Sequence, residues 1–508
     1  MKQYLLGIDI GTSGTKVLLI DESGKKIASV TEEYPLYTPR PMWAEQEPLD
    51  WWQATVKGIQ KIIAKDGVNS EDIVGIGLSG QMHGSVFLDK DSKIIRPALL
   101  WCDQRTVQEC DIITERAGRD VVLNETLNPV LTGFTAPKIL WLERNEPDNY
   151  KKLAKVLLPK DYVRFMLTGE MYGDVSDASG TSLFNVKTRQ WSAPMVEATG
   201  INMDMLTSVL ESCEVCGYIT ADIAKLTGLK EGTPVVAGGG DNAAGAVGNG
   251  IVREGIASCS IGTSGVFFAH LKKLLVDTNG YRTHTFCAAV PNEWHVMGVQ
   301  LSSGGSFRWF RDTLCREETE KAKELGIDPY ELMTKSAEEV NAGCEGLFFL
   351  PYLTGERCPY QDPYASGAFF GLTLRHAKPH LTRAVMEGVT YGLRDALEIF
   401  HEMGTSPSEI RLTGGGGKSP LWRQIQADIY NSRCVTVSQD EGPGFGAALL
   451  AGVGVKVYNS VPDACEKTVE IGNETLPTAD QEIYSKYYPL FKKLYAANKD
   501  IFKMIAGI

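Results

Sequence analysis

The sequence predicts an α/β protein built from two similar domains. A five-residue segment, Ile-Gly-Thr-Ser-Gly, occurs twice, at Ile10–Gly14 and at Ile261–Gly265, each time between two short apolar runs. This pattern is typical of a β-hairpin with a tight turn. A chain of 508 residues is also too long for a single hydrophobic core. One copy of the hairpin in each half therefore predicts two duplicated domains with a cleft between them.

The tips of the two hairpins are expected to bind phosphate groups. Glycines let a ligand approach the backbone closely, and the free backbone N–H groups of such a tip attract anions. Four side-chain hydroxyls add further donors: Thr12, Ser13, Thr263 and Ser264. Two tips, one in each domain, predict a polyphosphate that is held from both sides.

An acidic residue precedes only the first of the two turns. Asp9 stands where the second copy of the segment has Ser260. A carboxylate beside a phosphate site is favourable only when a cation lies between the two groups. Asp9 is therefore predicted to act on Mg²⁺ through a bound water molecule.

The rest of the first half reads as alternating strands and helices. Lys26–Tyr34 is expected to form a third strand, and Asp50 is expected to cap a helix whose apolar residues share one face. Ile73–Leu78 is predicted to be a buried strand that leads into the loop Ser79–Gly84. Much later in the chain, Thr233–Ala237 is predicted to be another strand.

A glycine turn, Gly238–Asn242, follows that strand and leads into a helix of small residues that starts near Ala243. Because the second hairpin begins shortly afterwards, the domain boundary is expected near residues 245–258. The predicted domains are residues 1–247, residues 256–455, and a peripheral helical extension over residues 456–508.

The second half is expected to repeat the alternation of helices and strands. A long helix is predicted over Leu381–Met403, a strand over Glu409–Thr413 and a helix over Leu421–Asn431. A strand over Cys434–Val437 and a helix over Phe445–Val453 complete the series.

Composition excludes several classes of function. The net charge of -12 disfavours nucleic acid or an anionic membrane surface as a partner. No uninterrupted apolar run is long enough to span a bilayer, and the N-terminal residues lack the pattern of a signal peptide. The 11 cysteines are odd in number and scattered, which is typical of a reducing compartment. We expect a cytoplasmic protein.

Two further glycine clusters imitate nucleotide-binding motifs. Gly414–Ser419 looks like the end of a P-loop, but the first glycine of that motif would fall at Leu412. Gly238–Ala243 fits a dinucleotide fingerprint, but Asp241 places a carboxylate where a pyrophosphate would bind. A third interpretation unites the clusters: two phosphate-binding hairpins, a glycine turn for the nucleoside, and an acid on the facing domain.

That combination resembles the actin–hexokinase class of ATP-binding folds, whose two domains are ribonuclease H-like, and within it the FGGY carbohydrate kinases. Gly133–Leu142 is similar to the first motif of this family, and Gly367–Gly371 followed by His380–Glu387 is similar to the second. The segments Gln81–Gly84 and Gly238–Gly245 are most similar to the members that phosphorylate D-xylulose. The resemblance covers nearly the whole chain. It implies D-xylulose as acceptor, MgATP as donor and D-xylulose 5-phosphate as product.

Asp241 is the predicted general base of this reaction. Phosphoryl transfer requires a hydroxyl in line with the γ-phosphate, neutralisation of charge by a metal, and a group that accepts the proton. An aspartate at a strand-to-helix turn is kept ionised and oriented by the helix N-terminus. The alternative is that Asp241 only caps the helix.

The sugar-binding residues follow from the resemblance. Met82 would supply an apolar wall and His83 a hydrogen-bonding ring, and Asn242 would bind a further hydroxyl. Trp101 could stack on the sugar carbons, with Asp103 and Arg105 as hydroxyl partners. The alternative for these three residues is a structural ion pair under a buried indole.

The nucleotide-binding residues also follow from the resemblance. Gly262 and Thr263 are expected to hold the β- and γ-phosphates, with Thr12 and Ser13 opposite. A second group is expected to approach the nucleoside through bare backbone: Gly304, Gly415 and Gly416. Gly304 could instead serve only to start a helix. Whether Lys16 contacts phosphate or lies on the surface is left open by the sequence.

Two other functions remain compatible with the motifs. One is a kinase of the same family that acts on another pentulose or polyol. The other is a non-enzymatic ATP switch, because this fold class includes switch proteins as well as enzymes. Cys213 and Cys216 form a C-x-x-C pair without the second pair that a zinc site requires. A homodimer is common among relatives, but the sequence leaves the oligomeric state open.

Overall fold

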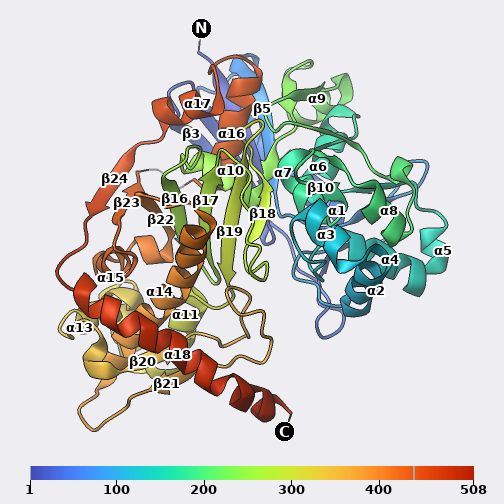
Figure 1. The fold of residues 1–508 in the computed structure, drawn as a ribbon. Helices are drawn as coiled ribbons and strands as arrows, with labels where there is room; N and C mark the ends of the chain where they lie inside the picture. The colour runs from blue at the N-terminus through green and yellow to red at the C-terminus, as the bar shows by residue number, and fades with distance from the viewer. Residues whose placement is uncertain (1, 439–440, 508) are drawn as a thin grey trace.

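Two mixed seven-stranded sheets form the framework of the chain (Figure 1). The computed structural model describes residues 2–438 and 441–507. The first sheet has the order β13-β14-β5-β1-β2-β3, and the short strand β15 also pairs with β5. Its strands are β1 (Tyr4–Ile10), β2 (Gly14–Asp21), β3 (Lys26–Glu33), β5 (Ile73–Gly80), β13 (Val215–Tyr218), β14 (Pro234–Val236) and β15 (Gly239–Gly240).

The second sheet has the order β18-β19-β17-β16-β22-β23-β24. Its strands are β16 (Ile256–Ile261), β17 (Gly265–Leu271), β18 (His284–Cys287), β19 (Trp294–Gln300), β22 (Glu409–Gly414), β23 (Arg433–Val437) and β24 (Ile471–Thr475). Both repeated segments therefore form hairpin turns, between β1 and β2 and between β16 and β17, as the repeat predicts.

Helix α1 (Pro48–Ile63) covers one face of the first sheet, against β2 and β3. Its own side chains Trp51 and Ile59 are fully buried. The predicted cap is wrong: Glu47 precedes the helix and Asp50 lies in its first turn. Proline is favoured at the first helical position because it has no N–H to satisfy there, so the helix begins at Pro48.

Helix α16 (Pro443–Gly454) covers the other face of the first sheet, although it comes from the second half of the chain. The contact is close because β1 carries a glycine beneath it. A Cβ added at Gly7 would lie 1.9 Å from the carbonyl oxygen of Gly444. Residues of the predicted second domain (256–455) thus also pack on the first sheet.

Helix α10 (Asp241–Gly248) packs side by side with α16 and joins the two halves (Figure 1). A Cβ added at Gly446 would lie 1.8 Å from the carbonyl oxygen of Ala244, so only glycine permits this approach. Helix α10 starts directly after β15 of the first sheet. The packing of α10 against α16 therefore fixes the position of Asp241, the first residue of α10.

The core of the second half forms around α14 (Lys378–Met403). The C-terminal helix α18 (Gln481–Ala506) contributes to this core through Tyr484 and Phe491, both fully buried. The expectation of a peripheral extension over residues 456–508 is therefore wrong in this respect, since the segment also supplies the edge strand β24. The spacing of apolar residues along a helix does not show how much of that helix is buried against a neighbouring helix.

The remaining elements surround the two sheets. The other helices are α2 (Val107–Ala117), α3 (Arg119–Thr126), α4 (Thr135–Asn145), α5 (Pro147–Tyr150), α6 (Pro159–Thr168), α7 (Val175–Ala178), α8 (Ala193–Thr199), α9 (Ala221–Thr227), α11 (Gly304–Leu314), α12 (Arg316–Leu325), α13 (Pro329–Ala337), α15 (Pro420–Tyr430) and α17 (Val461–Thr468). Short paired strands are β4 (Glu45–Gln46) with β7 (Ala98–Leu99), β6 (Val86–Leu88) with β8 (Lys155–Leu157), β9 (Tyr172–Asp174) with β12 (Ser208–Leu210), β10 (Phe184–Asn185) with β11 (Gln190–Trp191), and β20 (Phe348–Leu350) with β21 (Ala368–Phe370).

Among the described residues, no helix is both long enough and apolar enough to cross a bilayer.

Candidate functional site

The predicted catalytic residues lie at the carboxyl ends of three neighbouring parallel strands. In the register of the first sheet, Asp9 of β1 pairs with Ser79 of β5, and Ser79 pairs with Gly239 of β15. Asp241 follows two residues after Gly239, at the start of α10. Open α/β sheets place their ligands at this edge, because the strands end there in loops that converge.

Asp241 is the first residue of α10 rather than its cap. Gly240 occupies the cap position, so the capping alternative for Asp241 is wrong in its strict form. Oδ1 of Asp241 accepts hydrogen bonds from the backbone N–H of Asn242 at 2.7 Å and from its Nδ2 at 3.0 Å. No described residue donates a hydrogen bond to Oδ2, which leaves one oxygen for a substrate.

Burial raises the pKa of Asp241 to about 7, and the charge of Asp9 adds to this effect. The hydrogen bonds from Asn242 only partly offset the increase. A carboxyl group whose pKa lies near neutrality suits a general base, since it is ionised in use and still binds a proton well.

Asp9 has one carboxylate oxygen, Oδ1, that is buried and without a hydrogen-bond partner among the described residues. Burial raises the pKa of Asp9 to about 6, and the Ser79 hydroxyl and the Lys16 charge offset part of the rise. An orphaned, electron-rich oxygen at a phosphate-binding turn fits a hydrated Mg²⁺ ion, which prefers oxygen ligands and keeps several waters. The donor set therefore fits the predicted metal.

His83 and Met82 form one wall of this end of the sheet. The ring of His83 stacks on Phe134, with centroids 4.5 Å apart. Its Nδ1 donates a hydrogen bond to the carbonyl oxygen of Gly180 at 2.7 Å. Burial first, and then the charge of Lys138, lower the pKa of His83 to about 3. The ring is neutral, and Nε2 is therefore a hydrogen-bond acceptor.

Asn242 connects this wall to the predicted base. Its Nδ2 lies 3.9 Å from the sulfur of Met82, and the same amide group contacts Asp241. Met82 is almost fully buried. The structure thus brings together four residues that the sequence assigned to the sugar: Met82, His83, Asp241 and Asn242.

Trp101 is 42% exposed, and its Nε1 donates a hydrogen bond to Oγ1 of Thr12 at 3.0 Å. This bond joins a predicted sugar residue to the first phosphate-binding turn. The indole leaves an accessible face of the kind that stacks on sugar carbons.

The environment of Asp103 favours the structural ion pair instead. The Asp103 side chain is fully buried, and its Oδ2 accepts hydrogen bonds from the backbone N–H of Ala44 and from Arg105, each at 2.7 Å. The guanidinium of Arg105 lies 3.6 Å from the ring centroid of Trp43. Both partners are buried, and the Arg105 guanidinium is also paired with Glu45, so the carboxylate of Asp103 serves this ion pair.

The predicted nucleotide residues meet in one cavity of about 760 Å³ in the second half. Five of them line it: Gly262, Thr263, Gly304, Gly415 and Gly416. Thr12 and Ser13 belong to the other hairpin and are not part of this lining. Gly304 both starts α11 and donates its N–H to the carbonyl oxygen of Gly262 at 2.8 Å. The two alternatives for Gly304 therefore hold together.

Sequence reasoning missed one wall of this cavity. Helix α13 supplies Tyr330, Glu331 and Thr334 to this wall. The sequence of this amphipathic helix contains no nucleotide-binding motif. It also missed Lys138, which is fully buried and donates to the carbonyl oxygens of His83 at 2.9 Å and of Gly133 at 2.7 Å. Lys138 lies in Gly133–Leu142, the segment that is similar to the first family motif. A lysine among apolar residues could have indicated a functional or positioning role, because lysine is rarely buried without partners.

Lys16 forms an ion pair with Glu441 at 2.6 Å and also donates to its carbonyl oxygen at 3.0 Å. Glu441 binds Lys26 as well. In this structure the charge of Lys16 is used to hold the loop before α16 against the first hairpin.

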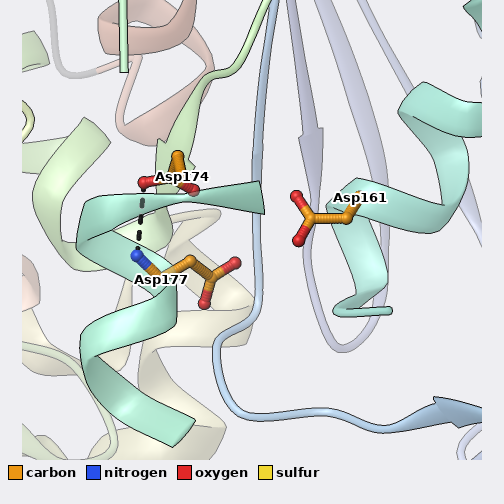
Figure 2. A group of neighbouring side chains, drawn as sticks. All are labelled: Asp161, Asp174 and Asp177. Atoms are coloured by element: carbon orange, nitrogen blue, oxygen red, sulfur yellow. Dashed lines mark hydrogen bonds between the residues drawn. The ribbon is translucent and has the colours of Figure 1, made fainter. Parts of the chain in front are cut away.

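A group of three buried aspartates lies behind the glycine turn: Asp161, Asp174 and Asp177 (Figure 2). Such a group could hold a metal, but the ammonium of Lys160 lies among them, 2.6 Å from Asp161 and 2.5 Å from Asp174. Burial lowers the pKa of Lys160, but the charges of these carboxylates outweigh that effect and raise the pKa above its ordinary value. A lysine thus occupies the position of the cation.

Two family models match almost the whole chain. Residues 4–248 match the model of the "FGGY family of carbohydrate kinases, N-terminal domain", and residues 257–455 match that of the C-terminal domain. Xylulose kinase of Escherichia coli is 40% identical over 494 residues, which cover 96% of this chain and 98% of the relative.

Solved structures share the whole fold. A structure described as "a xyloylose kinase from Brucella ovis" superposes with a TM-score of 0.90 at 35% identity, over 98% of this chain and 100% of the other. Gluconate kinase from Lactobacillus acidophilus gives a TM-score of 0.92 at 26% identity, over 99% and 100% of the two chains. The predicted actin/hexokinase-like α/β fold with two domains is thereby confirmed.

Proposed function

Because the chain belongs to the FGGY family of carbohydrate kinases, we propose that it transfers the γ-phosphoryl group of MgATP to D-xylulose and releases ADP and D-xylulose 5-phosphate. Relatives named xylulose kinase at 36–40% identity support this acceptor. The observation that carries the proposal is the placement of Asp241, with its pKa near 7, beside Met82 and Asn242.

Asp241 acts as the general base. Its free oxygen, Oδ2, accepts the proton of the primary hydroxyl as the hydroxyl oxygen forms its bond to the γ-phosphorus. The bond between that phosphorus and the β–γ bridging oxygen breaks on the opposite side, and ADP leaves with the electron pair. The hydrogen bonds from Asn242 to Oδ1 hold the carboxylate in one orientation during this step.

The neutral imidazole of His83 orients the acceptor. Since Nδ1 donates to Gly180, Nε2 accepts a hydrogen bond from a sugar hydroxyl. Met82, which is only 3% exposed, backs this site with an apolar side chain, and Trp101 presents its exposed indole face to the same sugar. Asp103 is left with a structural role.

Asp9 would hold a Mg²⁺ ion through water at the first hairpin, with its free Oδ1 as the acceptor. The ion, when bound, would supply neutralisation of the charge on the transferred phosphoryl group. Thr12 and Ser13 complete the hairpin tip from the first half, opposite Gly262 and Thr263.

The cavity lined by Gly304, Gly415 and Gly416 receives the nucleoside. Bare backbone at these positions lets adenosine lie against the second sheet, and α13 closes the far side. The nucleotide then points its phosphates along the second hairpin toward the first. Closure of the two halves would expel water, which otherwise competes with the sugar as an acceptor.

All 11 cysteines are unpaired in the structure, which supports the expected reducing compartment, the cytoplasm. A homodimer stays a prediction from the family.

Gluconate is the second candidate acceptor, because the TM-score with a gluconate kinase, 0.92, is similar to the TM-score of 0.90 with the kinase from Brucella ovis. An ADP-release assay with MgATP tests the two against each other. The panel is D-xylulose, D-ribulose, L-ribulose, L-xylulose, glycerol and gluconate, at equal concentrations. Selective turnover of D-xylulose supports the proposal. Selective turnover of gluconate or another polyol would overturn the acceptor and the assignment of Met82 and His83.

A further inference from the structure

The glycine turn that carries Asp241 is held from both ends by buried polar side chains of the neighbouring helices. On the near side, the guanidinium of Arg164 in α6 donates to the carbonyl oxygen of Ala237. On the far side, the backbone N–H of Gly240 donates to Oγ of Ser176 in α7 at 3.1 Å. These two bonds bracket the two glycines between them, so the path of the turn is fixed immediately before Asp241.

Ser176 has only one orientation available for its hydroxyl. Its O–H is donated to Oδ1 of Asp174, so a lone pair of Oγ is left to face the N–H of Gly240. Asp174 is itself fixed, because Oδ1 also accepts the backbone N–H of Ser176 at 2.9 Å and Oδ2 pairs with Lys160 at 2.5 Å. Figure 2 shows Asp174 beside Asp177 in this cluster.

The Gly240 peptide has no alternative support from its own side chain. A Cβ added at Gly240 would lie 2.8 Å from Cγ of Met82, so a capping side chain cannot be placed there without displacing the sugar wall. Gly240 is the cap residue of α10 and makes no side-chain cap bond. The hydroxyl of Ser176 instead accepts the backbone N–H of the cap residue, the contact that a side chain in the first turn makes in a capping box.

We propose that Ser176 is a positioning residue for Asp241. Its hydroxyl, aligned by Asp174 and Lys160, fixes the Gly240 peptide and thereby the direction in which the Asp241 carboxylate leaves α10. The inference rests on the proposed function, in which Asp241 is the base. Ser176 is fully buried and has no surface open to a ligand, so its removal is expected to slow transfer without changing how the nucleotide binds.

A double-mutant cycle tests this relation. The variants are Ser176→Ala, Asp241→Glu and the combination of both, each assayed for kcat and for KM with MgATP and the sugar. Ser176→Ala is expected to lower kcat about tenfold while KM for MgATP stays within twofold. In the Asp241→Glu background, the longer side chain no longer depends on the same backbone direction, so Ser176→Ala is expected to cost less than twofold.

Two controls separate positioning from loss of stability. Thr227→Val removes another buried hydroxyl, at the end of α9, that also accepts a backbone N–H at 3.3 Å, that of Leu229. It is expected to lower the thermal midpoint but to keep kcat. Ser176→Thr retains the hydroxyl and is expected to restore at least half of the wild-type kcat. If Ser176→Ala does not fold, Ser176→Cys and Ser176→Thr are compared in its place.

The results distinguish this inference from the proposed function. An equal loss of kcat on Ser176→Ala in both backgrounds, or no loss in the wild-type background, would overturn the positioning role. Retention of turnover by Asp241→Asn would instead overturn Asp241 as the base, whatever Ser176→Ala does.

Discussion

Asp9 and Asp241 interact electrostatically at the carboxyl end of the first sheet: the charge of Asp9 raises the pKa of Asp241. The two residues are far apart in sequence, and the register of β1, β5 and β15 brings them together. Because loss of hydration raises the pKa of both carboxyl groups, keeping both ionised is costly without a partner. A bound cation on the side of Asp9 removes that cost, and a hydroxyl proton arriving at Asp241 does the same. The electrostatics of the free protein thus favour binding of the reactants.

Asp241→Asn is expected to lower kcat for sugar phosphorylation by about 10³-fold or more, because the amide cannot accept the hydroxyl proton. Binding of MgATP should change less than threefold, since the nucleotide cavity lies in the second half. Chemical-quench kinetics with calorimetric titration of nucleotide measures both quantities. Turnover within tenfold of wild type would show that Asp241 only starts the helix.

The pH dependence of kcat/KM for the sugar is expected to report Asp241. Its carboxylate is the active form and its pKa is about 7 in the free site, so activity should rise tenfold per pH unit below that value and level off above it. His83, with its pKa lowered to about 3, should not titrate in this range. A flat profile from pH 5.5 to 8.5 would contradict the assignment.

Stability should change with pH in the direction opposite to activity. The folded pKa of Asp241 lies above its unfolded value of 3.8, so the ionised carboxylate reduces stability, and that loss grows as pH rises toward about 7. Asp241→Asn removes this loss. The variant should therefore be more stable than wild type at pH 8, by roughly 1–2 kcal/mol after allowance for solvent screening, and no more stable at pH 4. Denaturant unfolding at both pH values, without ligands, measures the difference.

Asp9→Asn is expected to impair the use of Mg²⁺ more than the binding of sugar. The amide keeps one oxygen but loses the charge that holds a hydrated cation. The Mg²⁺ concentration for half-maximal rate should rise about tenfold or more, while KM for the sugar stays within threefold. An unchanged Mg²⁺ titration curve would remove Asp9 from the metal side.

Gly304→Ala should weaken nucleotide binding. A Cβ at this position would lie 2.4 Å from the carbonyl oxygen of Gly262, so the second hairpin and α11 must separate. KM for MgATP should rise about tenfold, measured by initial rates. Gly415→Ala is the matched control for stability, because its Cβ would lie 3.6 Å from the nearest atom, the Ile261 oxygen. Equal thermal midpoints for the two variants would contradict the steric argument.

Much of this site could be predicted from sequence because it resides in short local patterns. The two hairpins, the turn before Asp241 and the glycines of the cavity are each contiguous segments whose turn chemistry is visible in the residues. The placement of one hairpin in each of the two sheets followed from the duplication of the segment.

The parts that could not be predicted depend on tertiary packing. Asp103 carries the residue type expected of a sugar ligand, and only the structure shows that Ala44 and Arg105 already occupy its oxygens. The sequence of α18 gives its period but not its burial against α14. The link from Ser176 to Gly240 joins residues from separate segments, and no spacing rule connects them.

The most direct test of the central claim is a single experiment with ATP labelled at the γ-phosphate, incubated with the protein, Mg²⁺ and D-xylulose, and analysed for products. We expect the label in D-xylulose 5-phosphate, in a one-to-one ratio with ADP and with no release of inorganic phosphate above the sugar-free rate. Label recovered only as inorganic phosphate, or in gluconate but not in D-xylulose when both are offered, would contradict the account.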